Sequence, residues 1–290
     1  MGKLKIIPIF VPHRGCPHQC SFCNQRHITG ETREVAAHDV REKIELYLST
    51  IDLQKHRAEV AFYGGSFTAI EIQRQNELLD AALEYKNAGK ISGIRLSTRP
   101  DCIDDAILGN LHARGVTEIE LGVQSMCDDV LRANRRGHTA ANVENAVNLI
   151  RKYNFSLGLQ IMTGLLCDSP QKSIYTAEKI AALKPDFVRI YPTLVFRDTD
   201  LYDECTAGRY VPQTVDEAAG LCAELARIFD RESIKIIRLG LLVADDEAKE
   251  KLVAGPYHPR FGELVRNIGN HPAPLLTQPM KGHHHVSEKT

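Results

Sequence analysis

The chain has 290 residues, of which 43% are hydrophobic, and its 36 Lys and Arg residues nearly balance its 37 Asp and Glu residues. This apolar content is enough to build a large core and excludes a disordered chain. The net charge of −1 excludes nucleic-acid binding through bulk charge and leaves room only for a local basic patch. The length fits either two domains or one α/β barrel.

Eight cysteines are too few for a disulfide scaffold in a chain of this length. The sequence shows no basic segment followed by an apolar one, as a secretory signal would. No apolar run approaches the roughly 18 residues needed to cross a bilayer. We therefore expect a reducing, cytoplasmic compartment and no membrane partner.

Short apolar runs recur about every 30 to 40 residues, a spacing typical of strands that alternate with helices. In chain order, the predicted strands cover residues 5–11, 59–63, 93–97, 118–123, 156–162, 187–191 and 234–239. Two of the segments between them show helical spacing of apolar residues, for example Val40, Ile44 and Tyr47, or Val143, Ala146, Val147 and Ile150. This alternation predicts parallel strands with right-handed crossovers, in a sheet that is either closed or open.

Several predicted helices have recognisable starts. Thr214 and Glu217 have the spacing of a capping box, and Ser169 precedes a proline at the first helical position. Asp101 and Asp104 are expected to bring negative charge to a helix N-terminus. These signals set the expected helix boundaries.

The predicted strands end in polar or glycine-containing loops at Gly64, Thr98, Gln124 and Gly164. The carboxyl ends of parallel strands gather on one rim of the fold, and ligands of α/β proteins bind at that rim. We therefore expect the functional site there.

Three of the cysteines fall within eight residues in the loop after the first strand, where Cys16, Cys20 and Cys23 form the pattern C-x3-C-x2-C. Structural zinc takes four ligands, usually in pairs, so three thiolates make a poor closed zinc site. A zinc site with His18 or His27 as fourth ligand is one alternative. An iron-sulfur cubane fits better, because three thiolates leave one iron open to another ligand. The other five cysteines are scattered singly and are interpreted as small, semi-buried residues.

The cysteine spacing, with Phe22 directly before Cys23, resembles that of the radical S-adenosylmethionine (radical SAM) superfamily. The resemblance implies a partial (β/α)6 TIM-like barrel of parallel strands, a 4Fe-4S cluster on Cys16, Cys20 and Cys23, and S-adenosylmethionine on the open iron. It also implies reductive cleavage of S-adenosylmethionine to a 5′-deoxyadenosyl radical, with a reductant such as ferredoxin or flavodoxin as partner. Phe22 is expected to lie against the cofactor.

Two glycines follow the second strand, and their missing Cβ atoms let the backbone approach a ligand closely. The segment Gly64, Gly65 and Ser66 is similar to the superfamily's Gly-Gly-Glu motif, which binds the methionine amino group. Because Ser66 replaces Glu, backbone contacts are expected to carry more of that role. The same resemblance places Thr98 near the adenosyl group and Gln124 near its ribose.

Arg136 and Gln160 complete the set of expected cofactor contacts. Arg136 lies in a segment similar to the superfamily's Arg-x-His, which implies that it pairs with the methionine carboxylate; a solvated helix face is the alternative for this charge run. Gln160 stands among apolar residues of the fifth strand, where a polar side chain is costly unless it is hydrogen-bonded. It either faces the cofactor, as polar residues of relatives do, or bonds to backbone in the core.

The resemblance covers roughly residues 3–240, so we predict a radical SAM core domain over 1–240 and a C-terminal extension over 241–290 with a loosely ordered end. The motif wording is most similar to the radical domain of the Elongator catalytic subunit, a tRNA wobble-uridine modifying enzyme, and to its short bacterial relatives. The chain has no room for Elongator's acetyltransferase domain. The radical chemistry is therefore expected to carry over, whereas the substrate is not fixed.

The leading prediction is a radical SAM enzyme that modifies RNA or a nucleobase, with tRNA as partner and no DNA. A basic cluster supports it, made of Arg14, Arg26, Arg132, Arg135 and Arg136. One alternative keeps the chemistry and takes a small molecule such as a tetrapyrrole. The other is an iron-sulfur protein that transfers electrons without turnover.

Overall fold

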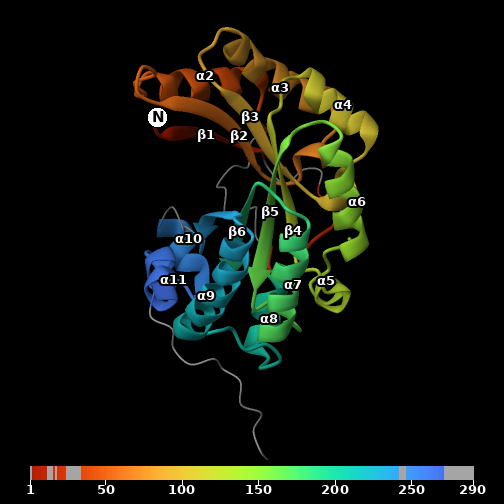
Figure 1. Cartoon of the computed structure of the whole chain (residues 1–290), viewed down its shortest axis with the longest axis vertical. Coiled ribbons are helices and arrows are strands. Elements are labelled where there is room, and N and C mark those ends of the chain that lie inside the picture. The colour runs from red at the N-terminus through yellow and green to blue at the C-terminus, as the bar shows by residue number, and fades with distance from the viewer. Residues whose placement is uncertain (1, 12–15, 17, 24–33, 242–245, 271–290) are drawn as a thin grey trace, which may run out of the picture.

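The computed structural model of the chain describes residues 2–11, 16, 18–23, 34–241 and 246–270. Seven parallel strands form its main sheet and are ordered as in the sequence. They are β1 (Leu4–Val11), β2 (Arg57–Gly64), β3 (Gly93–Thr98), β4 (Glu118–Gln124), β5 (Ser156–Thr163), β6 (Phe187–Pro192) and β8 (Lys235–Leu239). Within the described residues β1 and β8 do not pair, and the sheet curls into an open half-barrel (Figure 1). The predicted partial barrel is confirmed.

The helices follow the strands and pack on the outside of the half-barrel (Figure 1). They are α2 (Ala37–Leu48), α3 (Ile72–Asn87), α4 (Asp105–Ala113), α5 (Asp128–Ala133), α6 (Ala140–Arg151), α7 (Pro170–Ala182), α8 (Asp200–Thr206), α9 (Val215–Arg231), α10 (Asp246–Lys251) and α11 (Phe261–Asn270). Two short 3-10 turns, η1 (Phe67–Ala69) and η2 (Pro100–Cys102), follow β2 and β3. A second sheet pairs β7 (Val195–Phe196) with β9 (Leu252–Ala254).

The strands alternate between an apolar face that meets the helices and a polar face that lines the inside of the half-barrel. In β4, the side chains of Ile119, Leu121 and Val123 are fully buried in the main core. Glu118 and Glu120 point to the opposite face, because successive side chains of a strand alternate. The inside of this half-barrel therefore carries charged groups rather than an apolar filling.

The predicted helix caps are largely confirmed. Thr214 and Glu217 form the capping box of α9, and the Ser169 side chain accepts from the Lys172 N–H at the start of α7. Asp104 caps α4 by accepting from Ile107 N–H. Asp101 is different: it lies in η2 and pairs with Arg99 instead.

The helix α11 was not predicted from the sequence. It packs against α9 and β8, with Phe261 and Val265 buried. Its apolar residues Phe261, Leu264, Val265 and Ile268 have the helical spacing i, i+3, i+4, i+7, which is the signal that identifies it. Residues 271–290, expected to be loosely ordered, lie outside the described residues. In the described part of the chain, no helix is both long and apolar enough to span a membrane.

Candidate functional site

A cavity of about 100 Å³ lies at the carboxyl ends of β2 to β5 and gathers almost all the predicted site residues. Its lining comprises Cys16, Cys20, Cys23, Gly64, Gly65, Ser66, Ser97, Thr98, Arg99, Gly122, Gln124, Arg136 and Gln160. Of the predicted residues, Phe22 alone is absent from this lining: it packs against an apolar cluster that includes Leu201 and Tyr210. We name this cavity the rim cavity.

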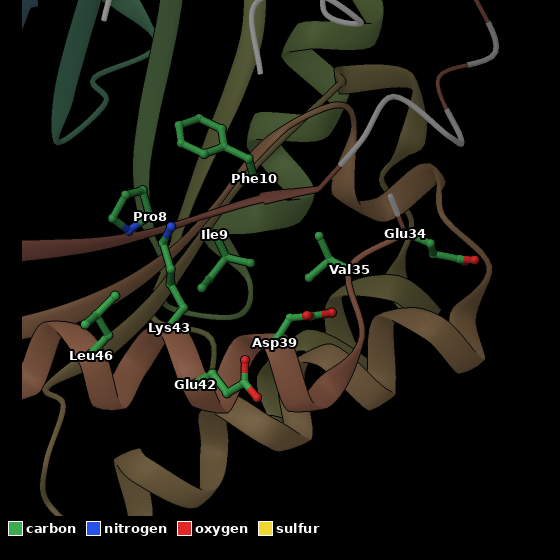
Figure 2. A pocket seen from close by; sticks show the side chains of 9 residues that line it. All are labelled: Pro8, Ile9, Phe10, Glu34, Val35, Asp39, Glu42, Lys43 and Leu46. Carbon is green, nitrogen blue, oxygen red and sulfur yellow. The ribbon is translucent and has the colours of Figure 1, made fainter. Parts of the chain in front are cut away.

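A larger cavity, of about 250 Å³, lies between β1 and α2 and holds none of the predicted site residues (Figure 2). Its polar side chains are Glu34, Asp39, Glu42 and Lys43. Size therefore does not identify the functional site of this protein. The site is identified instead by the thiols, glycines and guanidinium groups that together line the rim cavity.

Gly64 shapes the floor of the rim cavity. It has φ +111°, and a Cβ at this position would lie 2.4 Å from the carbonyl oxygen of Val11. Gly64 is aligned with Val11 in the β1–β2 pairing, and the Gly65 N–H donates to that same carbonyl. The two glycines thus bring the β2 loop against the end of β1, where the cysteine loop begins.

Ser66 uses its hydroxyl within the protein. Its Oγ lies 2.8 Å from Thr98 Oγ1 and accepts from the Arg99 N–H at 3.3 Å. Thr98 Oγ1 is also 2.5 Å from Thr68 Oγ1. These bonds join the loops after β2 and β3, so the Ser66 side chain stabilises the cavity wall.

Two guanidinium groups stand beside the cysteines. Arg136 Nη1 lies 3.2 Å from Cys20 Sγ, and its Nη2 donates to the carbonyl of Gly122. Arg99 Nη1 lies 3.9 Å from Cys16 Sγ, and its guanidinium also donates to the Arg136 carbonyl. Hydrogen bonds to sulfur and burial are two means by which a protein sets the reduction potential of a cluster.

Asp101 fixes the Arg99 guanidinium, accepting from Nε and Nη2 at 2.9 Å each. Burial shifts the pKa of each group towards its neutral form, but the pairing of Arg99 with Asp101 outweighs burial. The pKa of Arg99 is raised and the pKa of Asp101 is lowered, so both groups are charged. Arg99 is thus a buried, permanently charged neighbour of the cysteine loop. It was not among the predicted site residues, because a single Arg in a loop carries no signal until its partners are known.

The cavity contains buried polar atoms that lack a protein partner. Among the described residues, Gln124 Oε1 and Arg136 Nε are buried without a hydrogen bond. Gln124 also has φ 70°, next to an irregularity in the β4–β5 pairing. Buried unpaired groups and strained backbone are costly, and they persist where a ligand completes the site. The residues therefore fit a polar cofactor.

The cysteine sulfurs line the rim cavity without meeting at one point. Within the described residues, no three His, Cys, Asp or Glu side chains come close enough to share a single metal ion. His18 Nε2 lies 3.7 Å from Asp101 Oδ2, and His27 lies outside the described residues. Cys16, Cys20 and Cys23 line one cavity, and three thiolates leave one iron of a 4Fe-4S cluster open to another ligand.

His138 is a buried, neutral residue behind Arg136. Burial, followed by the positive charges of Arg136 and Arg99, lowers its pKa to about 3. Its Nε2 lies 3.1 Å from the carbonyl oxygen of Val123, so the neutral ring donates this proton to the backbone at the end of β4. His138 thereby supports the strand end that presents Gln124.

Gln160 connects the rim cavity to a charged network inside the half-barrel. Its Nε2 donates to Glu120 Oε2 at 2.9 Å, and Arg189 Nε lies 2.6 Å from the same oxygen. Of the two interpretations of Gln160, the structure places it in the cavity lining and bonded to a side chain. Arg95 extends the network on β3, where it forms ion pairs with Glu59 and Glu118. Charged residues alternating with apolar ones in β3, β4 and β6 are the sequence signal for this network.

The predicted basic cluster is divided by the fold. Arg136 turns into the rim cavity, whereas Arg132 and Arg135 line an adjacent shallow cavity with His18 and Thr139. Arg135 pairs with Asp200 at 2.5 Å. Arg14 and Arg26 lie outside the described residues.

Family models match most of the chain. Residues 10–172 match the Radical SAM superfamily, and residues 185–268 match the Radical_SAM C-terminal domain. That superfamily uses a 4Fe-4S cluster and S-adenosylmethionine.

Curated relatives and a solved structure are similar to this chain. The tRNA uridine(34) acetyltransferase of Dehalococcoides mccartyi is 26% identical over 243 residues, covering 72% of this chain and 53% of the relative. Elongator complex protein 3 of Schizosaccharomyces pombe is 32% identical over 158 residues, covering 51% of this chain and 28% of the relative. The archaeal Methanocaldococcus infernus Elp3 shares the fold, with a TM-score of 0.72 and 21% identity over 93% of this chain and 63% of that chain.

The chain spans about half the length of the curated relatives that it matches first. The superfamily model nevertheless covers more than half of the chain, including the three clustered cysteines, the glycine loop and Arg136. This protein therefore belongs to the radical SAM superfamily.

Proposed function

We propose that this protein is a radical SAM enzyme that modifies a nucleobase of RNA. The observation that carries the proposal is the rim cavity, where three cysteines, a glycine loop and two buried guanidinium groups line one small space. When bound there, the cluster and S-adenosylmethionine supply a 5′-deoxyadenosyl radical, generated with an electron from a reductant such as ferredoxin or flavodoxin. The eight free thiols agree with the reducing, cytoplasmic location that we propose.

Each lining residue has a specific task in this proposal. Cys16, Cys20 and Cys23 bind the cluster, and the backbone of Gly64 and Gly65 accepts from the methionine ammonium group. Arg136 lines the cavity and has a buried, unpartnered Nε, and its positive charge suits the methionine carboxylate.

The remaining polar side chains orient the nucleoside part of the cofactor. Gln124 has a buried, unpartnered Oε1 that can accept from a ribose hydroxyl. Thr98, at the end of β3, lies beside the adenosyl group. Gln160 links the cofactor region to the charged network of Glu120 and Arg189 inside the half-barrel, where the substrate is held.

The RNA substrate rests on the names of the similar curated relatives and on charge. Arg132 is exposed and stands with Arg135 on the rim beside the cofactor region. With a net charge of −1, the protein needs such a local patch to bind phosphates. We place the RNA backbone across these arginines, with one base directed into the half-barrel.

The radical chemistry is tested by anaerobic reconstitution with iron and sulfide, followed by dithionite and S-adenosylmethionine. We expect 5′-deoxyadenosine from the wild-type protein and its loss in Cys20→Ala, together with the cluster's visible absorbance. Cys167→Ser is the matched control, because Cys167 is exposed and outside the rim cavity. A protein that gains the cluster and forms no 5′-deoxyadenosine is an electron carrier, and the proposal fails.

The substrate is tested by comparing tRNA nucleosides from a deletion strain with those from its parent. A nucleoside missing in the deletion strain and restored by the wild-type gene, but not by the Cys20→Ala gene, supports the proposal. Unchanged nucleosides, together with no salt-sensitive tRNA binding at low ionic strength, overturn RNA as the substrate. Accumulation of a tetrapyrrole in that strain assigns the small-molecule alternative.

A further inference from the structure

An exposed aromatic ring stands on the inside of the half-barrel at the end of β1. Phe10 is 41% exposed and is aligned with Tyr63 in the β1–β2 pairing, with ring centroids 6.4 Å apart. Figure 2 shows the Phe10 ring on the opposite side of β1 from Ile9 and Val35. Phe10 also borders the larger cavity between β1 and α2. Its neighbours Ile9 and Val11 are buried in the core, so the alternation of the strand turns the Phe10 ring away from the helices.

Tyr63 is held from the far side of the half-barrel. The Arg189 guanidinium, from β6, lies 5.8 Å from the centroid of the Tyr63 ring, and its Nη2 donates to Tyr63 Oη at 3.2 Å. Arg189 is itself fixed by the fully buried Glu120. The Tyr63 ring is therefore a rigid support beside the exposed ring of Phe10.

This aromatic pair adjoins the rim cavity. Gly64, which lines the cavity, is the residue after Tyr63, and one residue of a strand spans about 3.3 Å. Gln160 also lines the cavity and shares Glu120 with Arg189. A flat ring stacked on Phe10 would thus lie next to the region where the three cysteines gather.

The chemistry of this surface favours a nucleobase. Unpaired bases of RNA bind proteins by stacking on exposed aromatic rings and on guanidinium planes. The Tyr63 hydroxyl and the Arg189 guanidinium bond to each other and to Glu120, so the surface beside the exposed Phe10 ring is polar. A base has a flat ring with polar edges and suits this surface better than a purely apolar ligand. We propose that Phe10, supported by Tyr63, is the stacking residue for the base on which the enzyme acts; this inference rests on the RNA substrate proposed above.

The test measures the affinity of the full chain for two RNA stem-loops by fluorescence anisotropy. One has a uridine at the loop position that the enzyme modifies, and the other has an abasic nucleotide there. We expect the wild-type protein to bind the uridine form about tenfold more tightly, since an abasic nucleotide has no ring to stack on Phe10. Phe10→Ala should bind both forms alike, and Phe10→Tyr should restore the preference.

Leu4→Ala is the matched control, because Leu4 is a similarly exposed apolar residue at the other end of β1. It should keep the wild-type preference. Urea unfolding of each variant verifies that the fold is retained, and Phe10→Tyr keeps the test valid if Phe10→Ala is unstable.

Two results would overturn the inference while leaving the RNA substrate in place. One is a Phe10→Ala variant that still prefers the uridine form as the wild type does. The other is a wild-type protein that binds both stem-loops equally well. If the wild type binds neither stem-loop at low salt, the RNA substrate itself fails, and the assay for 5′-deoxyadenosine still reports on the radical chemistry.

Discussion

At Gly64 the backbone leaves no space for a side chain, and the rim cavity depends on that residue. Its φ of +111° disfavours any residue with a Cβ, and the added carbon would press on the Val11 carbonyl. We predict that Gly64→Ala lowers the free energy of unfolding by about 2 to 3 kcal/mol, from strain plus this collision. Urea unfolding of the metal-free protein measures the change.

Gly89 provides the control for that prediction. It also has positive φ, +69°, but an added Cβ would meet nothing within 4 Å. Gly89→Ala should therefore cost only about 1 kcal/mol of backbone strain. Equal losses in the two variants would show that the contact with Val11 is unimportant.

His138 makes stability depend on pH in a defined direction. Its folded-state pKa is about 3, below its ordinary value of 6.5, so the unfolded chain binds a proton that the folded protein excludes. Stability linked to His138 is complete above pH 6.5 and decreases as the pH falls from 6.5 towards 3. We predict that His138→Gln, which keeps an N–H donor, removes this dependence. Relative to the variant, the wild type should lose about 3 kcal/mol between pH 7 and pH 4.

The comparison with the variant is needed because Glu118 changes the pH dependence of stability in the opposite direction. Burial raises the pKa of Glu118 to about 7 from its ordinary value of 4.5. Its contribution is therefore complete below pH 4.5 and is lost as the pH rises through 7. The difference between wild type and His138→Gln cancels this effect. A difference that stays constant with pH would contradict a neutral, buried His138.

At the level of elements, the strands and several helix starts could be predicted from the sequence, whereas the charged network inside the half-barrel could not. Each strand has a local period of two, and Thr214 and Ser169 mark helix starts by contacts within four residues. Glu120 and Arg189 are 69 residues apart, and their pairing depends on the curvature of the whole sheet. The sequence alone pointed to Cys16, Cys20 and Cys23 because their spacing is local. The position of Arg99 beside Cys16 and Arg136 could not be predicted, because these partners are distant from it in the sequence.

The helix α11 should contribute directly to the stability of the half-barrel. Phe261 is 3% exposed and packs in the main core, close to Gly240. We predict that Phe261→Ala lowers the free energy of unfolding by about 3 kcal/mol, because apolar burial decreases and a cavity is left behind. Val211→Ala is the control, since Val211 is 83% exposed and should change stability by less than about 0.5 kcal/mol. A Phe261→Ala variant as stable as this control would show that the packing of α11 does not contribute to the free energy of unfolding.

For the whole molecule, the near-zero net charge means that the proposed RNA binding depends on a local patch. We predict that Arg132→Gln makes the dependence of log K on log salt shallower by about one for tRNA. Arg227→Gln changes the net charge equally, but Arg227 is exposed on α9, away from the arginines of the rim, and the slope should stay unchanged. Equal effects of the two variants would indicate that bulk charge, rather than the rim, attracts the RNA.

The order of the strands also has a consequence for biosynthesis. Because each strand from β2 to β6 pairs with the one made just before it, the half-barrel can grow unit by unit as the chain emerges from the ribosome. Cys20 precedes its partner Arg136 by 116 residues, which at about 5 to 20 residues per second leaves its thiol uncovered for about 6 to 23 seconds. During this interval the cysteine loop has no pocket around it. We therefore expect insertion of the proposed cluster to follow completion of β4 and of the turn that carries Arg136. Until then, only reducing surroundings would protect the three thiols.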